Sequence, residues 1–204
     1  MKAYTLPDFI DYLLIPDLEK MAQHQLHYYA FSAICQGIEI MGAAIDEKPL
    51  EEFSLSEQRF TNSLATFFKD TRYKNNQSKF FSVLRGPLIH QLRPGDGFYL
   101  ASEVKDNIKP ECHLTTQETG ATLLIIEPFI RDFKQAFVRF KYHLQKNHPP
   151  SPERFTTTFI HVCPLPQDLG KTSWNKELSC SITLTPYATG SAILPKAFPE
   201  SSID

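Results

Sequence analysis

Hydrophobic residues recur at spacings of three and four along most of the first 147 positions, which is the periodicity of amphipathic helices. The pattern predicts one long helix from Pro16 to Ile45, because proline and acidic residues favour the first turn of a helix. Further helices are expected over residues 6–14, after a cap at Ser54 or Ser56, over residues 80–92 and over residues 127–147. The polar segment 69–77 is expected to be a solvated turn.

The pattern changes after the turn sequence PGDG, residues 94–97. Short strands are predicted over residues 98–102, 111–116 and 121–126, the last two joined as a hairpin through Thr119-Gly120. Three prolines in "NHPPSPERF" end the last helix, and two more strands, residues 156–163 and 177–185, are expected beyond them. The sequence therefore predicts a mainly α fold. A helical domain, residues 1–147, carries a small β-hairpin insertion, and a proline-rich, β-containing C-terminal extension, residues 148–204, packs on it.

Composition and charge are ordinary for a soluble globular protein, with 42% hydrophobic and 22% charged residues. The net charge of −2 provides no general attraction for nucleic acid, so RNA binding would need a local basic patch, and nothing indicates DNA. Asp8 and Asp11 interrupt the N-terminus before a signal peptide could form, and no segment approaches the ~18 apolar residues of a membrane span. Four scattered cysteines favour free thiols and a cytoplasmic location.

Arg85 and His90 lie five positions apart in the apolar run "SVLRGPLIHQL", residues 82–92. Pro87 disfavours continuation of a preceding helix, so we expect a helix to start or kink there, with Arg85 at its mouth. A guanidinium binds phosphate oxygens in a bidentate manner, and a histidine exchanges protons near neutral pH. Together they could cleave RNA without a metal. His90 would transfer a proton at the ribose 2′-hydroxyl or the leaving oxygen, and Arg85 would stabilise the charged phosphorane.

The pattern R-x-x-x-x-H near the start of a late helix, within a small helical core, resembles the HEPN superfamily, many of whose members are ribonucleases. The segment "VLRGPLIHQL" is similar to the R-x-G-L-x-H form of uncharacterised bacterial members. "ICQGIEIMGAAID", residues 34–46, resembles their earlier helix with an acidic residue, and residues 127–144 resemble their closing helix. The resemblance covers residues 1–147. It implies a homodimer that acts on RNA in one shared cleft, with Arg85 and His90 catalytic and Glu39 orienting Arg85.

Two other interpretations of the motif stay open. Active nucleases of this family usually carry a polar residue directly after the arginine, whereas Gly86 and Pro87 offer neither a side-chain donor nor a base. A non-catalytic module that binds a partner protein through the same surface is therefore the alternative hypothesis. The third interpretation is purely structural: Glu39, alone in an apolar helix face, forms a buried ion pair with Arg85, and His90 is a hydrogen-bonded core histidine.

A basic cluster of Arg72, Lys74 and Lys79 precedes the motif and is the candidate contact for an RNA backbone. His24 and His27 lie three positions apart on the predicted long helix and could ligate zinc, but no third ligand accompanies them at a characteristic spacing.

Two further features receive no functional role. The sequence "GKTS", residues 170–173, lacks the earlier glycine of a phosphate-binding loop and is attributed to chance. His113 and His161 fall in predicted strands and are left unassigned. The sequence therefore predicts neither a metal nor a cofactor.

Overall fold

The computed structural model describes residues 2–46, 48, 52–147 and 160–162. The chain divides into two units, Met1–Pro164 and Leu165–Asp204. The second unit lies outside the described residues, together with the predicted strand over residues 177–185 and the GKTS segment. Everything below concerns the first unit.

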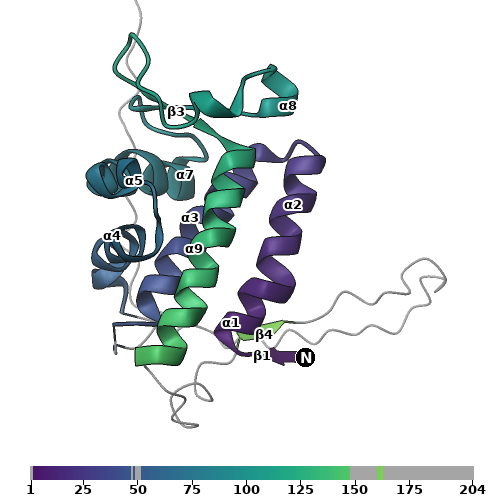
Figure 1. Cartoon of the computed structure of the whole chain (residues 1–204), viewed down its shortest axis with the longest axis vertical. Helices are drawn as coiled ribbons and strands as arrows, with labels where there is room; N and C mark the ends of the chain where they lie inside the picture. The colour runs from purple at the N-terminus through teal and green to yellow at the C-terminus, as the bar shows by residue number, and fades with distance from the viewer. Residues whose placement is uncertain (1, 47, 49–51, 148–159, 163–204) are drawn as a thin grey trace, which may run out of the picture. The chain divides into compact units, whose positions relative to one another are not determined.

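Helices make up most of the described part of the chain (Figure 1), which confirms a mainly α protein. In chain order the α-helices are α1 (Leu6–Phe9), α2 (Ile15–Gln23), α3 (His27–Ala43), α4 (Ser56–Phe67), α5 (Thr71–Asn75), α6 (Gln77–Lys79), α7 (Gly86–Gln91), α8 (Glu103–Asp106) and α9 (Ile126–Asn147). Two π-helical segments, η1 (Ile10–Leu14) and η3 (Phe80–Arg85), and two 3₁₀ turns, η2 (Phe53–Leu55) and η4 (Pro110–Cys112), complete the helical elements. The strands are β1 (Lys2–Tyr4), β2 (Phe98–Ala101), β3 (Thr122–Ile125) and β4 (Ile160–Val162).

The core is built around α9, which packs against α2, α3 and α4. Its predicted apolar face is confirmed, because all of its members are buried: Phe129, Phe133, Ala136, Phe137, Phe140 and Leu144. Where α3 crosses α4, Gly42 allows the closest approach, since a Cβ at this position would lie 2.0 Å from the carbonyl oxygen of Arg59. In the described part of the chain, no helix is both long enough and apolar enough to span a bilayer.

The predicted helix from Pro16 to Ile45 is in fact two helices. Gln25, with a φ of 59°, stands in the left-handed position after α2, and the N–H of Leu26 closes the helix end on the carbonyl of Met21 at 2.7 Å. This is a Schellman motif, which usually carries glycine at the left-handed position. A glutamine there left no signal in the sequence, so the turn was not predicted.

The β structure also differs from the prediction. β2 matches the first expected strand and pairs with β3 in parallel, Phe98 opposite Thr122. The predicted hairpin is wrong in its first strand, because Pro110 opens the 3₁₀ turn η4 and only the Thr116–Thr122 bridge is antiparallel. Of the strand predicted over residues 156–163, the part from Ile160 to Val162 lies within the described residues, where it forms β4 and pairs with the N-terminal β1. The β2–β3 sheet and the β1–β4 ladder lie at opposite ends of the long helices (Figure 1).

Candidate functional site

The helix that carries the Arg85 motif runs without a break from Gln77 to Gln91, through α6, η3 and α7. Pro87 has no N–H and its ring excludes the usual bond to the carbonyl of Val83. The preceding π-helical segment accommodates this, because the N–H of Gly86 bonds to the carbonyl of Phe81 instead. The freed carbonyl of Val83 accepts the N–H of Gly95 at 2.7 Å. Of the two alternatives expected at Pro87, a new helix start or a kink, the new start with free N–H groups for a phosphate is wrong, because the helical run continues through Pro87.

The expected ion pair between Glu39 and Arg85 is present. Arg85 Nη2 lies 2.6 Å from Glu39 Oε2, and the hydroxyl of Ser56 donates to Glu39 Oε1 at 2.6 Å. Both charged side chains are mostly buried, with 16% of Arg85 and 18% of Glu39 exposed. Arg85 Nε and Glu39 Oε2 are both buried and have no hydrogen-bond partner among the described residues, so Oε2 meets Arg85 as an ion pair only. The guanidinium also lies 5.5 Å from the centre of the Phe81 ring.

Cys35 lies one turn before Glu39 on α3 and is completely buried. Burial raises the pKa of its thiol to about 12, although the cation of Arg85 opposes the shift. The thiol is therefore protonated at neutral pH and is not a nucleophile for this cluster.

His90 does not join this cluster. Five residues along an α-helix correspond to about 140° around its axis, so side chains at this spacing point in different directions. Arg85 points to α3, whereas His90 is exposed on α7, and no described residue forms a hydrogen bond or ion pair with it. Within one chain the two motif residues are not brought together, and His90 is not a core histidine.

The predicted RNA-binding cluster is largely occupied by internal contacts. Arg72 Nη2 lies 2.6 Å from Asp70 Oδ2, and Arg72 Nη1 donates to the carbonyl of His113 at 2.8 Å. Lys79 Nζ donates to the hydroxyl of Thr122 at 3.0 Å. Of the three predicted cations, only Lys74 is exposed with no partner among the described residues.

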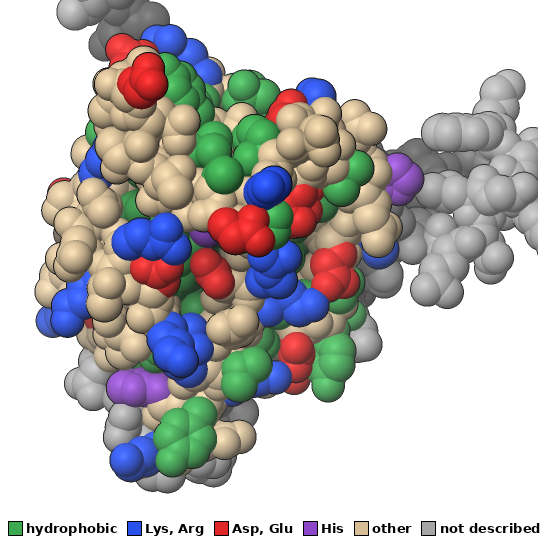
Figure 2. Space-filling model, turned by 45° about the horizontal axis from the view of Figure 1, so that its top comes forward, with side chains coloured by type: hydrophobic (Ala, Val, Ile, Leu, Met, Phe, Trp, Pro, Cys, Tyr) green, Lys and Arg blue, Asp and Glu red, His purple; other side chains and the backbone are tan. Residues whose placement is uncertain are grey.

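The face shown in Figure 2 carries Lys and Arg side chains interspersed with Asp and Glu rather than a continuous basic surface. Alternating charge of this kind attracts a polyanion weakly, because neighbouring carboxylates offset the field of each cation.

The two histidines of the zinc hypothesis do not lie on one helix. His24 caps the end of α2 and His27 begins α3, on either side of the turn at Gln25. Among the residues that the structure describes, no group of three or more His, Cys, Asp or Glu side chains is placed to hold a metal ion.

A buried polar network that the sequence did not reveal lies behind the basic cluster. The segment expected to be a solvated turn contains α5, whose Tyr73 is completely buried. The Tyr73 hydroxyl lies 2.9 Å from His113 Nε2 and donates to Asp132 Oδ2 at 2.8 Å. His113 Nδ1 accepts the N–H of Ile125 at 3.0 Å, so the ring proton is on Nε2 and is donated to Tyr73. These contacts join α5, the segment after η4, β3 and α9.

Burial governs the pKa values of this network. Burial, followed by the nearby Arg72 cation, lowers the pKa of His113 to about 3. Burial and the Asp132 carboxylate raise the pKa of Tyr73 well above its usual value, and burial raises the pKa of Asp132. His113 and Tyr73 are therefore both neutral at neutral pH. Since Tyr73 and His113 are sealed from solvent, the arrangement connects elements of the fold and offers no open site for a substrate.

The described fold defines a mainly helical protein with small two-stranded sheets at the ends of its helices. In comparisons with known proteins, no family model, no curated protein and no solved structure matches this chain.

Proposed function

We propose that this chain is a HEPN-like, non-catalytic interaction module that binds a second copy of itself through the exposed end of α7. The observation that carries the proposal is the separation of the motif. Arg85 is turned inward to Glu39, whereas His90 and Leu92 are left at the surface. A guanidinium that is already neutralised by a carboxylate attracts a phosphate less strongly, which argues against a catalytic role.

Leu92 supports a contact surface at this point. It ends α7 in the left-handed conformation, with φ 55°, and 66% of its side chain is exposed. A β-carbon in this conformation costs about 1 kcal/mol, and glycine is the usual residue here. An exposed apolar side chain in a strained backbone position adds little to the stability of the isolated chain and is open to contact with a partner. With Arg93 exposed beside it, a mixed apolar and cationic patch results.

The test is the mass of the protein in solution, measured by light scattering during size exclusion, for the wild type and for Leu92→Gly. Glycine removes the side chain and the backbone strain together, so the variant should be monomeric. At a concentration low enough to dissociate the wild-type dimer, the variant should melt at a higher temperature than the wild type. Val138→Ala is the control, because Val138 is an equally exposed apolar residue on α9. The control should remain dimeric. A wild type that is monomeric at high concentration, or a Leu92→Gly variant that is still dimeric, would contradict the proposal.

The second candidate function is metal-independent RNA cleavage in the same dimer. It is favoured by the exposure of His90 next to the proposed contact, because two copies would then bring two histidines into one cleft. The test is cleavage of a mixed single-stranded RNA in EDTA by wild type, His90→Ala and His24→Ala, the last replacing another exposed histidine. If fragments with 2′,3′-cyclic phosphate ends form with the wild type and His24→Ala but not with His90→Ala, the protein is a nuclease and the interaction-module proposal is wrong. No cleavage by any of the three supports the module.

A further inference from the structure

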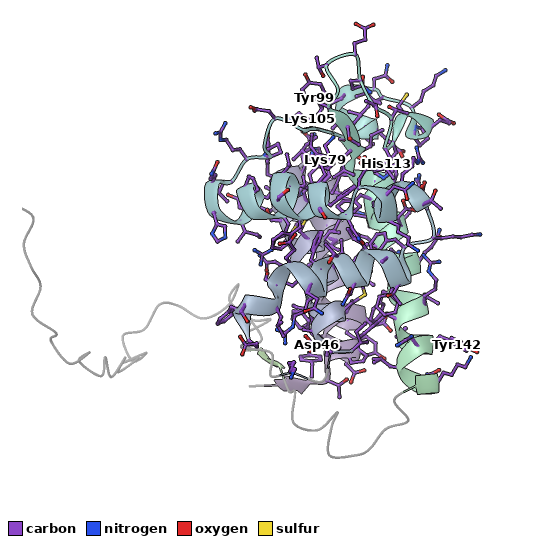
Figure 3. The ribbon with its side chains drawn as sticks, turned by 90° about the vertical axis from the view of Figure 1, so that its left-hand side faces the viewer. Asp46, Lys79, Tyr99, Lys105, His113 and Tyr142 are labelled. Carbon is purple, nitrogen blue, oxygen red and sulfur yellow. The ribbon has the colours of Figure 1, made fainter. Side chains whose placement is uncertain are left out.

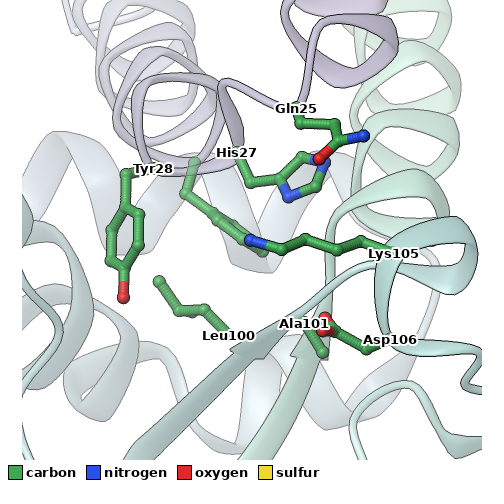
Figure 4. A pocket seen from close by; sticks show the side chains of 8 residues that line it. Gln25, His27, Tyr28, Leu100, Ala101, Lys105 and Asp106 are labelled. Atoms are coloured by element: carbon green, nitrogen blue, oxygen red, sulfur yellow. The ribbon is translucent and has the colours of Figure 1, made fainter.

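A pocket of about 150 Å³ opens between the turn that joins α2 to α3 and the end of β2 (Figure 4). Its apolar wall is formed by Phe31 and Leu100, with the ring of Tyr28 at the side, and Gln25 and His27 supply polar groups above it. None of these residues belongs to the α7 surface. An inference about this pocket therefore goes beyond the proposed function and does not depend on it.

Two oppositely charged side chains line the pocket, Lys105 and Asp106. The side chain of Lys105 extends across the opening toward His27 (Figure 4), and no described residue lies within hydrogen-bond or ion-pair distance of its ammonium group. Asp106 also lines the pocket, but one of its carboxylate oxygens accepts the N–H of Ser102 at 2.8 Å and is engaged with the start of α8. A ligand would therefore meet one free cation and one carboxylate that is partly occupied.

Of the ten large hydrophobic side chains that are exposed in the described part of the chain, one, Tyr28, lines the pocket. Four others, Leu26, Tyr29, Tyr99 and Val104, are adjacent to lining residues in the sequence. Figure 3 shows Tyr99 and Lys105 at one end of the molecule and Tyr142, another of the ten, at the other end.

The size of the pocket limits what it can hold. Pockets for drug-sized ligands occupy about 300–1,000 Å³, and one water molecule occupies about 30 Å³ in the liquid. A volume of about 150 Å³ therefore has room for a group the size of one ring and for little more. A whole nucleotide does not fit.

We propose that this pocket binds a small anion with an apolar body of about one ring, the ring lying against Phe31, Leu100 and Tyr28 and the anionic group reaching Lys105. An aromatic carboxylate or an aryl phosphate monoester has this chemistry. Two sources can supply the carboxylate form: a free aromatic acid, or the C-terminal residue of a peptide.

The test is a titration of the full chain with phenylacetate, phenyl phosphate and the neutral phenylacetamide, followed by amide NMR shifts. Both anions should bind and shift the signals of Tyr28, Leu100 and Lys105, and phenylacetamide should bind at least fivefold more weakly. Lys105→Gln should weaken phenylacetate about fivefold, the effect of one lost partly exposed ion pair. Lys109→Gln, a nearby exposed lysine outside the pocket, is the control and should change nothing.

A short peptide ending in phenylalanine, with a free carboxylate or with an amide, distinguishes the two sources. Tighter binding of the free-acid peptide than of phenylacetate assigns the pocket to a peptide terminus, and the reverse order assigns it to a free acid. Absence of binding by both anions at millimolar concentration, equal binding of phenylacetamide, or full affinity in Lys105→Gln would each overturn the proposal.

Discussion

Replacing His113 by asparagine tests whether its buried ring controls how the stability of the fold depends on pH. Asparagine places an amide oxygen near the position of Nδ1, so the N–H of Ile125 keeps an acceptor while the titratable ring is lost. In the wild type, protonation of Nδ1 would turn this acceptor into a donor that faces the N–H of Ile125. This conflict adds to burial in keeping the ring neutral.

The expected magnitude follows from the two pKa values. An unfolded histidine takes up a proton below pH 6.5, whereas His113 in the fold does so only at about pH 3. Between these values the unfolded state binds more protons, so the free energy of unfolding falls as the pH falls, and the full contribution is present above pH 6.5. At about 1.4 kcal/mol per pH unit, His113 alone lowers the free energy of unfolding by about 3 kcal/mol between pH 7 and pH 4. The raised pKa of Asp132 acts in the opposite direction. Asp132 is present in both the wild type and His113→Asn, so its contribution cancels to first order when the pH dependence of the two proteins is compared.

The assay is urea unfolding at pH 7 and pH 4 for wild type, His113→Asn and the exposed-histidine control His90→Asn. The wild type should lose about 3 kcal/mol more than His113→Asn between the two pH values. His90→Asn should follow the wild type, because its side chain is exposed and makes no hydrogen bond. Equal pH dependence of wild type and His113→Asn would refute the assignment of a buried neutral histidine. If His113→Asn does not fold, Tyr73→Phe serves instead. Tyr73→Phe removes the hydroxyl that accepts the Nε2 proton of His113, and it should lower the free energy of unfolding by about 1–2 kcal/mol at pH 7.

Two further predictions concern the packing of α3. Gly42→Ala should lower the free energy of unfolding by about 1–3 kcal/mol in urea titration, because the new Cβ would meet the backbone of α4. The control Gln36→Ala, on the exposed side of the same helix, should change this free energy little. Equal effects of the two substitutions would contradict the close approach of α3 and α4. Cys35 should be alkylated by iodoacetamide only after denaturation, whereas the partly exposed Cys112 should react in the native protein. Peptide mass spectrometry measures both sites, and native labelling of Cys35 would show that α3 is not packed as described.

The prediction drawn from Arg85 and His90 was correct for the ion pair of Arg85 and wrong for the shared anion site. The sequence indicated that Glu39 needed a partner and that Arg85 could supply it, and this pair is present. The spacing of Arg85 and His90 suggested a shared anion site at a helix start. That expectation relied on Pro87 breaking the helix. Whether a proline breaks a helix depends on whether the freed carbonyl finds another donor, and that donor comes from Gly95, outside the helix.

By itself the sequence determined the elements whose residues carry a strong local signal. The 3.6-residue period of apolar side chains defined α9 and its buried face, and the turn sequence PGDG separated the helices from β2, because both signals arise within one or two turns of chain. Only the tertiary structure decided which polar groups meet. Tyr73, His113 and Asp132 are separated by up to 59 positions, and each looks unremarkable among its sequence neighbours. Their hydrogen bonds, and the low pKa of His113, exist only because packing around α9 buries Tyr73 and His113 and brings Asp132 alongside them.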